Sequence, residues 1–272
     1  MRISKKTIYN GDMMSNIKKS KNTSLGTENT LRLLMLFSTY EELTVQKISE
    51  VLELNISAVY RIVNTMSNMN FIEQQDNRAY KLRAPHILRL YNKVNTEIRD
   101  YAKPIVTELV ESFNESIYIG EIYDGNKMMI IHKEEGTRHL QWRDNIGSVY
   151  PVAAGVAGKI ILAHDIRKMS VEEAEKFLFG LELVEYTEHS ITDYETLRLT
   201  LEQYYRDGYG ITIEQHIPGS VGISVPIFNF DRSECRASLT MMMATSNYDA
   251  SKNELYIQAL KNAAEKIGEN II

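Results

Sequence analysis

Two runs of apolar residues at helical spacing lie close together in the first third of the chain. The first run is Ile48, Val51 and Leu52, and the second is Val59, Ile62, Val63 and Met66. Both follow the i, i+3, i+4 spacing of an amphipathic helix, and only residues 53–55 separate them. Two short strand-like segments follow, residues 71–73 and 78–82, around a polar Asp76-Asn77 turn. Helix, short turn, helix and hairpin in this order predict a winged helix-turn-helix, in which the second helix enters the major groove of DNA.

The polar face of the second predicted helix carries side chains that suit DNA. Small and polar donors on such a face reach phosphates and base edges. With one basic residue on the first helix and one in the wing, the candidate DNA-binding residues are Lys47, Ser57, Ala58, Tyr60, Arg61, Asn64 and Arg78. Arg61 is the strongest candidate because it lies on the polar side of the recognition helix. Tyr60 is also compatible with packing against the wing, and Lys47 and Arg78 with ordinary solvated charges.

A further apolar stripe follows the predicted wing. Pro85 suits the first turn of a helix. The stripe of this helix consists of Ile87, Leu90, Tyr91, Val94 and Ile98. A single amphipathic helix between two domains must bury its stripe, and a second copy of the chain is the simplest partner. We therefore predict a linker helix over residues 86–100 and a homodimer or a dimer of dimers, with Pro104 opening the next helix.

Strand and helix patterns alternate in the remainder of the chain. Residues 124–126 (Asp-Gly-Asn) predict a hairpin turn, and residues 156–164 an Ala- and Gly-rich helix. Capping-box patterns mark three further helix starts, at Ser170 with Glu173, Thr192 with Glu195, and Ser251 with Glu254. Strands are predicted over residues 209–214, 221–228 and 235–243. The pattern predicts an α+β domain with a mostly antiparallel sheet.

Length and charge divide the chain into parts. At 272 residues it is too long for one winged helix, and 43% hydrophobic and 25% charged residues are typical of a soluble globular protein. Residues 1–100 hold 15 Lys and Arg against 10 Asp and Glu, whereas residues 101–272 hold 16 against 26. Positive charge therefore gathers where DNA binding is predicted. We predict a flexible basic arm (1–24), a winged helix-turn-helix domain (25–85), the linker helix (86–100) and a second domain (101–272).

Several signals for other classes of protein are missing from the sequence. No apolar run approaches the roughly 20 residues of a membrane span, and residues 1–26 lack the apolar core of a secretory signal. Cys235 is the only cysteine, so no intrachain disulfide forms. Histidine and cysteine spacings fit no metal site, and no motif indicates a cofactor. We expect a cytoplasmic protein with no membrane partner.

Several segments, taken in order, resemble the IclR family of bacterial transcriptional regulators. Residues 54–63 resemble the recognition segment of the family, with Glu53 at the usual turn glycine and Ala58 at the usual Thr. Residues 154–163 resemble its Ala-x-Gly-Lys-Ala-Leu-Leu-Ala helix, residues 186–192 its Thr-x-x-Thr-Ile segment, and residues 208–214 its Gly-Tyr then Glu pattern. The resemblance covers nearly everything from Leu31 onward. It implies a C-terminal α/β sensor domain with a curved antiparallel sheet, and it requires Glu53 to adopt a conformation that glycine adopts more easily.

The resemblance also implies an effector pocket between the curved sheet and its flanking helices. Carried over by position, its lining residues are Tyr150, Val152, Val156, Ala157, Thr212, Ser220, Gly222, Thr240 and Met242. Several of these places carry Asp, Cys and Ser in members that bind small carboxylates, and Gly222 stands at the Cys position. We therefore expect a less polar pocket with extra room near Gly222, and an effector larger or less polar than a two- or three-carbon acid.

The function that the resemblance implies is ligand-responsive transcriptional regulation, with operator DNA and a small organic metabolite as partners. We expect a repressor, and the sequence leaves an activator open. The main alternative is a metabolite-converting enzyme with an ancillary winged helix, but no motif assembles a nucleophile, a base and oxyanion donors. A protein–protein module is a third possibility, which the arginine-bearing helix face disfavours. Residues 155–159 do not form a phosphate-binding loop, because Ala153 and Ile160 stand where Gly and Ser or Thr are required, and we predict close helix packing instead.

Overall fold

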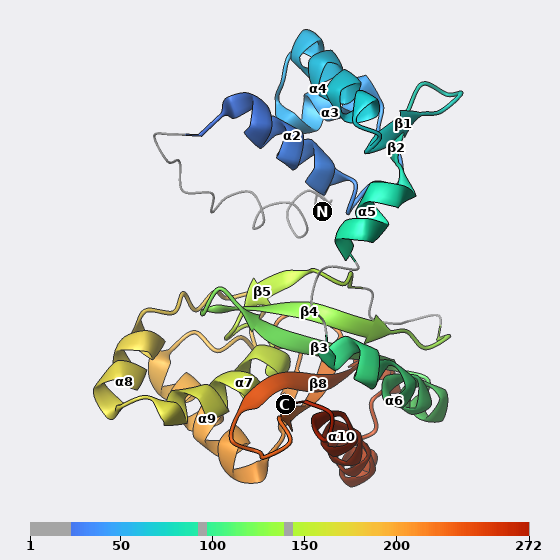
Figure 1. Ribbon diagram of the computed structural model, residues 1–272. Helices are drawn as coiled ribbons and strands as arrows, with labels where there is room; N and C mark the ends of the chain where they lie inside the picture. Colours follow the sequence, from blue (N-terminus) through green and yellow to red (C-terminus); the bar gives the residue numbers. More distant parts are fainter. Residues whose placement is uncertain (1–22, 92–96, 139–143, 272) are drawn as a thin grey trace. The chain divides into compact units, whose positions relative to one another are not determined.

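The computed structural model describes residues 23–91, 97–138 and 144–271 (Figure 1). The chain divides into two compact units, Met1–Asn95 and Thr96–Ile272, and each is described by itself. The predicted basic arm lies outside the described residues except for Thr23 and Ser24. No helix of the described residues is long and apolar enough to cross a membrane.

The N-terminal unit is a winged helix-turn-helix, as predicted. Its elements are α2 (Leu25–Leu36), α3 (Val45–Leu52), α4 (Ile56–Asn68), β1 (Ile72–Gln74), β2 (Tyr80–Leu82) and α5 (Ala84–Tyr91). Side-chain oxygens of Ser24, Thr44 and Asn55 accept hydrogen bonds from first-turn backbone amides and so start the first three helices. The antiparallel β1–β2 pair forms the wing. Leu33, Ile48 and Val59, each almost fully buried, hold the helices together in one small core.

Glu53 adopts the conformation that the sequence predicts for the turn between α3 and α4. Its φ of 56° and ψ of 39° lie in the left-handed region. Its backbone amide still donates to the carbonyl of Ser49, so the residue closes α3 in the way that glycine commonly does. A side chain in this region costs about 1–2 kcal/mol of backbone free energy, so the turn carries some strain.

The helix start predicted at Pro104 is wrong. The structure has α5 and α6 (Glu97–Phe113) in this region, and Pro104 lies inside α6 rather than at its start. The reason is a buried stripe that runs through α6 on both sides of the proline: Ile98, Ala102, Val106 and Leu109 pack into the core of the C-terminal unit. That burial outweighs the one backbone hydrogen bond that a proline removes. Ile98 therefore belongs to this core and not to the predicted dimer stripe, and Val94 lies outside the described residues. Residues 92–96 lie outside the described residues, so the extent of the linker helix stays a prediction.

The C-terminal unit is an antiparallel six-stranded sheet covered by helices on both faces (Figure 1). Its order is β5-β4-β3-β8-β7-β6, and the bounds are β3 (Ser116–Tyr123), β4 (Lys127–Glu134), β5 (Val149–Pro151), β6 (Gly210–Ile213), β7 (Ser220–Phe228) and β8 (Cys235–Ala244). Helices α6 and α10 (Asn253–Gly268) cover one face, and α7 (Val156–Asp165) covers the other. Helices α8 (Val171–Phe179) and α9 (Tyr194–Asp207) lie outside α7 (Figure 1).

Alternation along the strands divides the residues between the two faces. On β8, Met241 and Met243 pack toward α6 and α10, whereas Met242 packs with Tyr118 and Ala157 on the α7 side. Gly158 makes the close approach of α7 possible, because a Cβ there would lie 2.2 Å from the carbonyl oxygen of Val152. This close packing confirms the small-residue prediction for residues 155–159.

The three predicted capping boxes have three different outcomes. The box of Ser170 and Glu173 is complete and starts α8. Helix α9 starts one residue later than predicted, since Asp193 rather than Thr192 caps it. Ser251 caps nothing, because it lies in a 3₁₀ turn and α10 begins after Lys252 without a side-chain cap. Local capping patterns therefore located all three helices, but only for α8 did the pattern also give the first residue.

Candidate functional site

The candidate DNA-binding face is the solvent side of α4. Val59, Ile62, Val63 and Met66 are buried, which leaves Ser57, Tyr60, Arg61 and Asn64 exposed along the opposite side. Ala58 is half-buried, and its backbone amide donates to Asn55 Oδ1 at 2.8 Å in the N-terminal cap. The predicted residues of α4 therefore lie together on one side, with Ala58 at its edge.

The basic residues around this face differ in their ion pairs. Lys47 Nζ lies 3.3 Å from a Glu50 carboxylate oxygen, and Lys81 Nζ lies 2.9 Å from Glu41. Arg61 and Arg78 have no carboxylate within ion-pair distance among the described residues. Arg78 lies at the tip of the wing with a positive φ of 63°. These two guanidinium groups need no displacement of a carboxylate before they contact phosphate, whereas Lys47 does.

The second candidate site is a cavity at the start of α7, with a volume of ≈ 40 Å³. One water needs roughly 10–15 Å³ of such space, so the cavity holds more than a single water. Six of the predicted effector-binding residues line it: Tyr150, Val156, Ala157, Thr212, Ser220 and Met242. Val152 is fully buried in the core between α7 and α9. Thr240 is also fully buried, and its hydroxyl lies 2.8 Å from that of Ser224.

Gly222 does not open the cavity, and the extra room expected there is absent. A Cβ at this position would lie 2.8 Å from Met242 Sδ and 2.8 Å from Val156 Cγ1. Neighbouring side chains therefore already occupy the volume that the missing side chain leaves. The physical reason is close packing, since protein interiors leave few voids that are larger than a water molecule.

The lining also includes residues that the sequence did not single out. These are Tyr118, Met128, Asp144, Gly155, Gly158, His216 and Ile217. Tyr150 donates its hydroxyl proton to Asp144 Oδ1. Burial and the charge of Asp144 both raise the pKa of Tyr118, so this phenol stays protonated. Asp144 lies in a loop before β5, and no local motif connects it with α7.

The N-terminus of α7 contributes backbone amides to the cavity. Gly155 is the N-cap residue and supplies no side-chain hydrogen bond, so the first-turn amides have no side-chain cap. Gly155, Val156 and Ala157 all line the cavity. An uncapped helix N-terminus attracts oxygen acceptors through its free amides and its partial positive charge.

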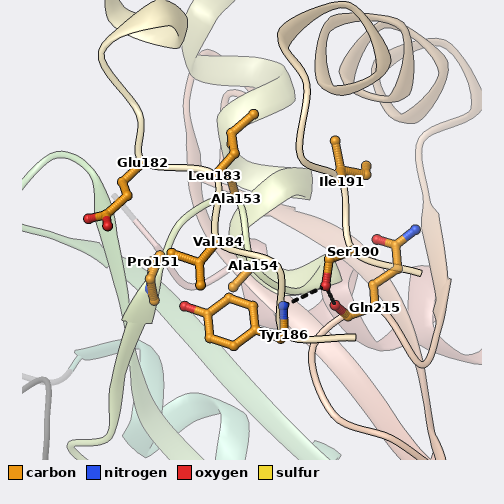
Figure 2. Close-up of a pocket in the computed structure, with 10 residues that line it drawn as sticks. All are labelled: Pro151, Ala153, Ala154, Glu182, Leu183, Val184, Tyr186, Ser190, Ile191 and Gln215. Atoms are coloured by element: carbon orange, nitrogen blue, oxygen red, sulfur yellow. Dashed lines mark hydrogen bonds between the residues drawn. The ribbon is translucent and has the colours of Figure 1, made fainter. Parts of the chain in front are cut away.

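A smaller cavity of ≈ 10 Å³ lies beside the same start of α7 (Figure 2). It is lined by Ala153 and Ala154, by the irregular segment 181–193 and by Gln215. Ser190 fixes that segment, because its hydroxyl accepts from the Tyr186 amide at 2.9 Å and donates to the Gln215 carbonyl at 2.7 Å (Figure 2). Tyr186 also packs edge-on against His216, with 4.5 Å between the ring centroids. Gln215 lines the smaller cavity, and its neighbour His216 lines the larger one.

Two family models match this chain. The model described as the bacterial transcriptional regulator IclR C-terminal domain matches residues 92–269, and the IclR helix-turn-helix domain matches residues 26–76. The chain belongs to the IclR family. This IclR-family protein is accordingly a transcriptional regulator that joins a helix-turn-helix to an IclR C-terminal domain.

Individual IclR-family relatives are similar over most of their length. The transcriptional regulator KipR of Bacillus subtilis is 26% identical over 244 residues, 89% of this chain and 95% of KipR. KdgR of Escherichia coli is 28% identical over 233 residues, 83% of this chain and 84% of KdgR. The crystal structure of the Thermotoga maritima IclR has a TM-score of 0.73 at 22% identity, covering 89% of this chain and 96% of that one. These relatives share its fold.

Proposed function

We propose that this regulator binds operator DNA through α4 and the wing, and that a small organic metabolite in the α7 cavity controls that binding. The observation that carries the DNA part is the unpaired Arg61 on an exposed helix face, with Ser57 and Asn64 beside it. Arginine in this setting binds guanine edges or clamps phosphate. The uncapped start of α7, beside a mainly apolar cavity that a few polar side chains also line, supports the effector part.

The experiment that tests this proposal measures DNA binding with and without fractions of cell metabolites. The probe is the DNA upstream of the regulator's own gene, titrated at several salt concentrations. We expect binding that weakens steeply as salt rises, and one fraction that changes the affinity. A regulator bound over the polymerase site of a promoter excludes RNA polymerase, and on that basis we expect repression that the effector relieves. Binding that is insensitive to salt, or to every fraction, would contradict the DNA part or the effector part respectively.

We further propose a homodimer or a dimer of dimers. Leu88 and Leu90 on α5 are 55% and 57% exposed, and an isolated chain leaves this apolar surface in water. Dimers of winged-helix regulators bind half-sites about 10 base pairs or a multiple apart. Leu88→Glu with Leu90→Glu should yield monomers in sedimentation, while the matched pair Leu199→Glu with Leu255→Glu on α9 and α10 should not change the mass. A wild type that is monomeric at micromolar concentration would contradict this proposal.

Catalysis has no place in the proposed function. Burial raises the pKa of the Cys235 thiol to about 12, which removes its nucleophilic form. The relatives of this chain are transcriptional regulators, which supports the same proposal. We expect the protein to act in the cytoplasm, where bacterial DNA is located.

A further inference from the structure

The wing and the residue after it carry three basic side chains, and these differ in the carboxylates around them. Lys81 Nζ lies 2.9 Å from Glu41 Oε1. Arg83 Nε lies 3.4 Å from Glu73 Oε2. Arg78, at the wing tip, has no carboxylate within ion-pair distance among the described residues. A paired cation must leave its carboxylate before it neutralises a phosphate, so the wing offers DNA its positive charge chiefly through Arg78.

The backbone of the wing tip, the loop between β1 and β2 in Figure 1, ends in a left-handed residue. The amide of Gln75 donates to the carbonyl of Ala79 at 2.8 Å, and the amide of Arg78 donates to the carbonyl of Gln75 at 2.9 Å. Arg78 has a φ of 63°, at the position where three-residue hairpin loops usually carry glycine. An arginine in this conformation is strained, so surrounding contacts must hold the loop in place.

Glu42 supplies such a contact from outside the wing. Asn77 Nδ2 donates to both carboxylate oxygens of Glu42, at 3.0 and 3.2 Å. On its other side, Asn77 Oδ1 accepts the backbone amide of Ala79 at 2.9 Å. Arg78 lies between Asn77 and Ala79 in the chain. The Glu42–Asn77 contact therefore restrains the backbone on both sides of the arginine.

The segment that carries Glu42 is itself attached to the wing. Leu43 and Tyr80 exchange backbone hydrogen bonds of 2.9 and 2.8 Å, and both side chains are buried. Glu42 thus extends from a fixed backbone, so little conformational entropy is lost when it holds Asn77. Both side chains of the contact are exposed, and an exposed contact adds little to folding stability. Its main consequence is the placement of the wing tip.

We infer that Glu42 is a positioning residue for DNA binding: through Asn77 it holds the wing tip in the conformation that presents Arg78 to a DNA phosphate. This inference rests on the proposed function, because it takes the wing as a DNA contact. Its consequence opposes simple electrostatics. A carboxylate close to DNA repels phosphates, so removing its charge alone should strengthen binding. Removing its hydrogen bond should weaken binding, because the arginine then loses its fixed position.

Two neutral replacements of Glu42 separate these effects. Glu42→Gln removes the charge and keeps an acceptor for Asn77, whereas Glu42→Ala removes both. The measurement is an anisotropy titration of the full chain at fixed salt, on a duplex that the wild-type protein selects from a random-sequence pool. We expect Glu42→Gln to bind at least as tightly as the wild type. Glu42→Ala should bind about threefold to tenfold more weakly than Glu42→Gln, which is the range for one hydrogen bond.

The same pair of replacements in an Arg78→Ala background tests whether Glu42 acts through the arginine. Arg78→Ala should weaken binding and lower the salt dependence by about one phosphate contact. In that background the two Glu42 variants should bind equally, because the group that they position is gone. Glu254→Gln and Glu254→Ala, at an exposed carboxylate of α10, are the matched control pair and should both bind like the wild type.

The outcomes distinguish this inference from the proposed function. Equal affinities of Glu42→Gln and Glu42→Ala, with weakened binding by Arg78→Ala, would overturn the inference and leave the wing contact standing. A difference that persists without Arg78 would also overturn it, since Glu42 would then act on the wing as a whole. Wild-type affinity of Arg78→Ala would overturn both the inference and the wing part of the proposed function. A wild type that selects no duplex would contradict DNA binding altogether.

Discussion

The two units present their functional groups in opposite ways. The N-terminal unit places Ser57, Arg61 and Asn64 on the outside of a single helix, where water solvates them until DNA arrives. The C-terminal unit encloses its groups between α7 and the sheet, and takes Tyr118, Asp144 and His216 from distant parts of the chain. Polar groups on an exposed face cost little folding free energy. Polar groups in a buried site must form hydrogen bonds or lose their charge, because burial removes them from water.

The contrast has a consequence for ionisation. In the C-terminal unit, burial lowers the pKa of Lys159 to about 7 and that of His216 to about 4. On the candidate DNA-binding face, the basic residues instead differ in whether a carboxylate already pairs with them, as Glu50 does with Lys47 and none of the described residues does with Arg61. Desolvation therefore governs the positive charges of the C-terminal unit, whereas neighbouring carboxylates govern those of the N-terminal unit.

Acidification should give the largest difference in folding stability between the two units. Burial lowers the pKa of His132, His164 and His216 to about 4, whereas unfolded histidine titrates near 6.5. Between these values the unfolded chain binds more protons than the folded one, so stability that is complete above about pH 6.5 is lost as pH falls toward 4. The loss reaches up to about 3 kcal/mol for His132, the most buried of the three.

Urea unfolding followed by Trp142 fluorescence measures this effect, because Trp142 is the only tryptophan and belongs to the C-terminal unit. We expect a lower midpoint at pH 5 than at pH 7. His164→Gln should reduce the difference, and the exposed His189→Gln should preserve it as a control. Equal midpoints at both pH values would contradict the prediction.

Overpacking the cavity wall should have the second-largest effect on stability. Gly222→Leu places a side chain where even a Cβ meets Met242 Sδ and Val156 Cγ1 at 2.8 Å. We expect a loss of about 1–3 kcal/mol of stability, with loss of the effector response. Thermal unfolding checks the first effect. Adding Met242→Ala to Gly222→Leu should regain part of the loss, and an undiminished Tm for Gly222→Leu would show that the site has open room after all.

Removing the unpaired arginine should weaken DNA binding and leave the C-terminal unit unchanged. Arg61→Ala should cost about 1–3 kcal/mol of binding free energy, roughly tenfold to a hundredfold in Kd. The measurement is a fluorescence-anisotropy titration at fixed salt. Arg206→Ala, an equally large charge change at a residue whose side chain is 74% exposed on α9, is the control and should bind normally. Unchanged affinity for Arg61→Ala would remove this residue from the DNA-binding site.

Relieving the turn strain should have the smallest effect. Glu53→Gly suits the left-handed φ of 56° between α3 and α4 and should stabilise the N-terminal unit by roughly 0.5–1 kcal/mol. Hydrogen exchange of α3 and α4 amides detects a change of this size. Glu53→Ala keeps the Cβ and should give no such gain, so equal protection in both variants would mean that the backbone is not strained there.

The sequence by itself determined the N-terminal unit almost completely. The apolar spacing of Val59, Ile62 and Val63 fixes which side of α4 faces the core, so the opposite side follows from helical geometry alone. The resemblance to the family also implied the left-handed turn at Glu53, because this residue stands at the usual turn glycine. These are local relations within a few turns of backbone.

Only the tertiary structure decided the limits of α6 and the chemistry of the cavity. Pro104 predicts a helix start locally, but burial of Ile98 and Ala102 against the sheet extends the helix to its N-terminal side. The volume at Gly222 depends on where Met242 and Val156 point, and the polar part of the lining includes Asp144 and His216, which are far from α7 in the sequence. Burial and contact between residues far apart in the chain are properties of packing, and packing has no local signature in the sequence.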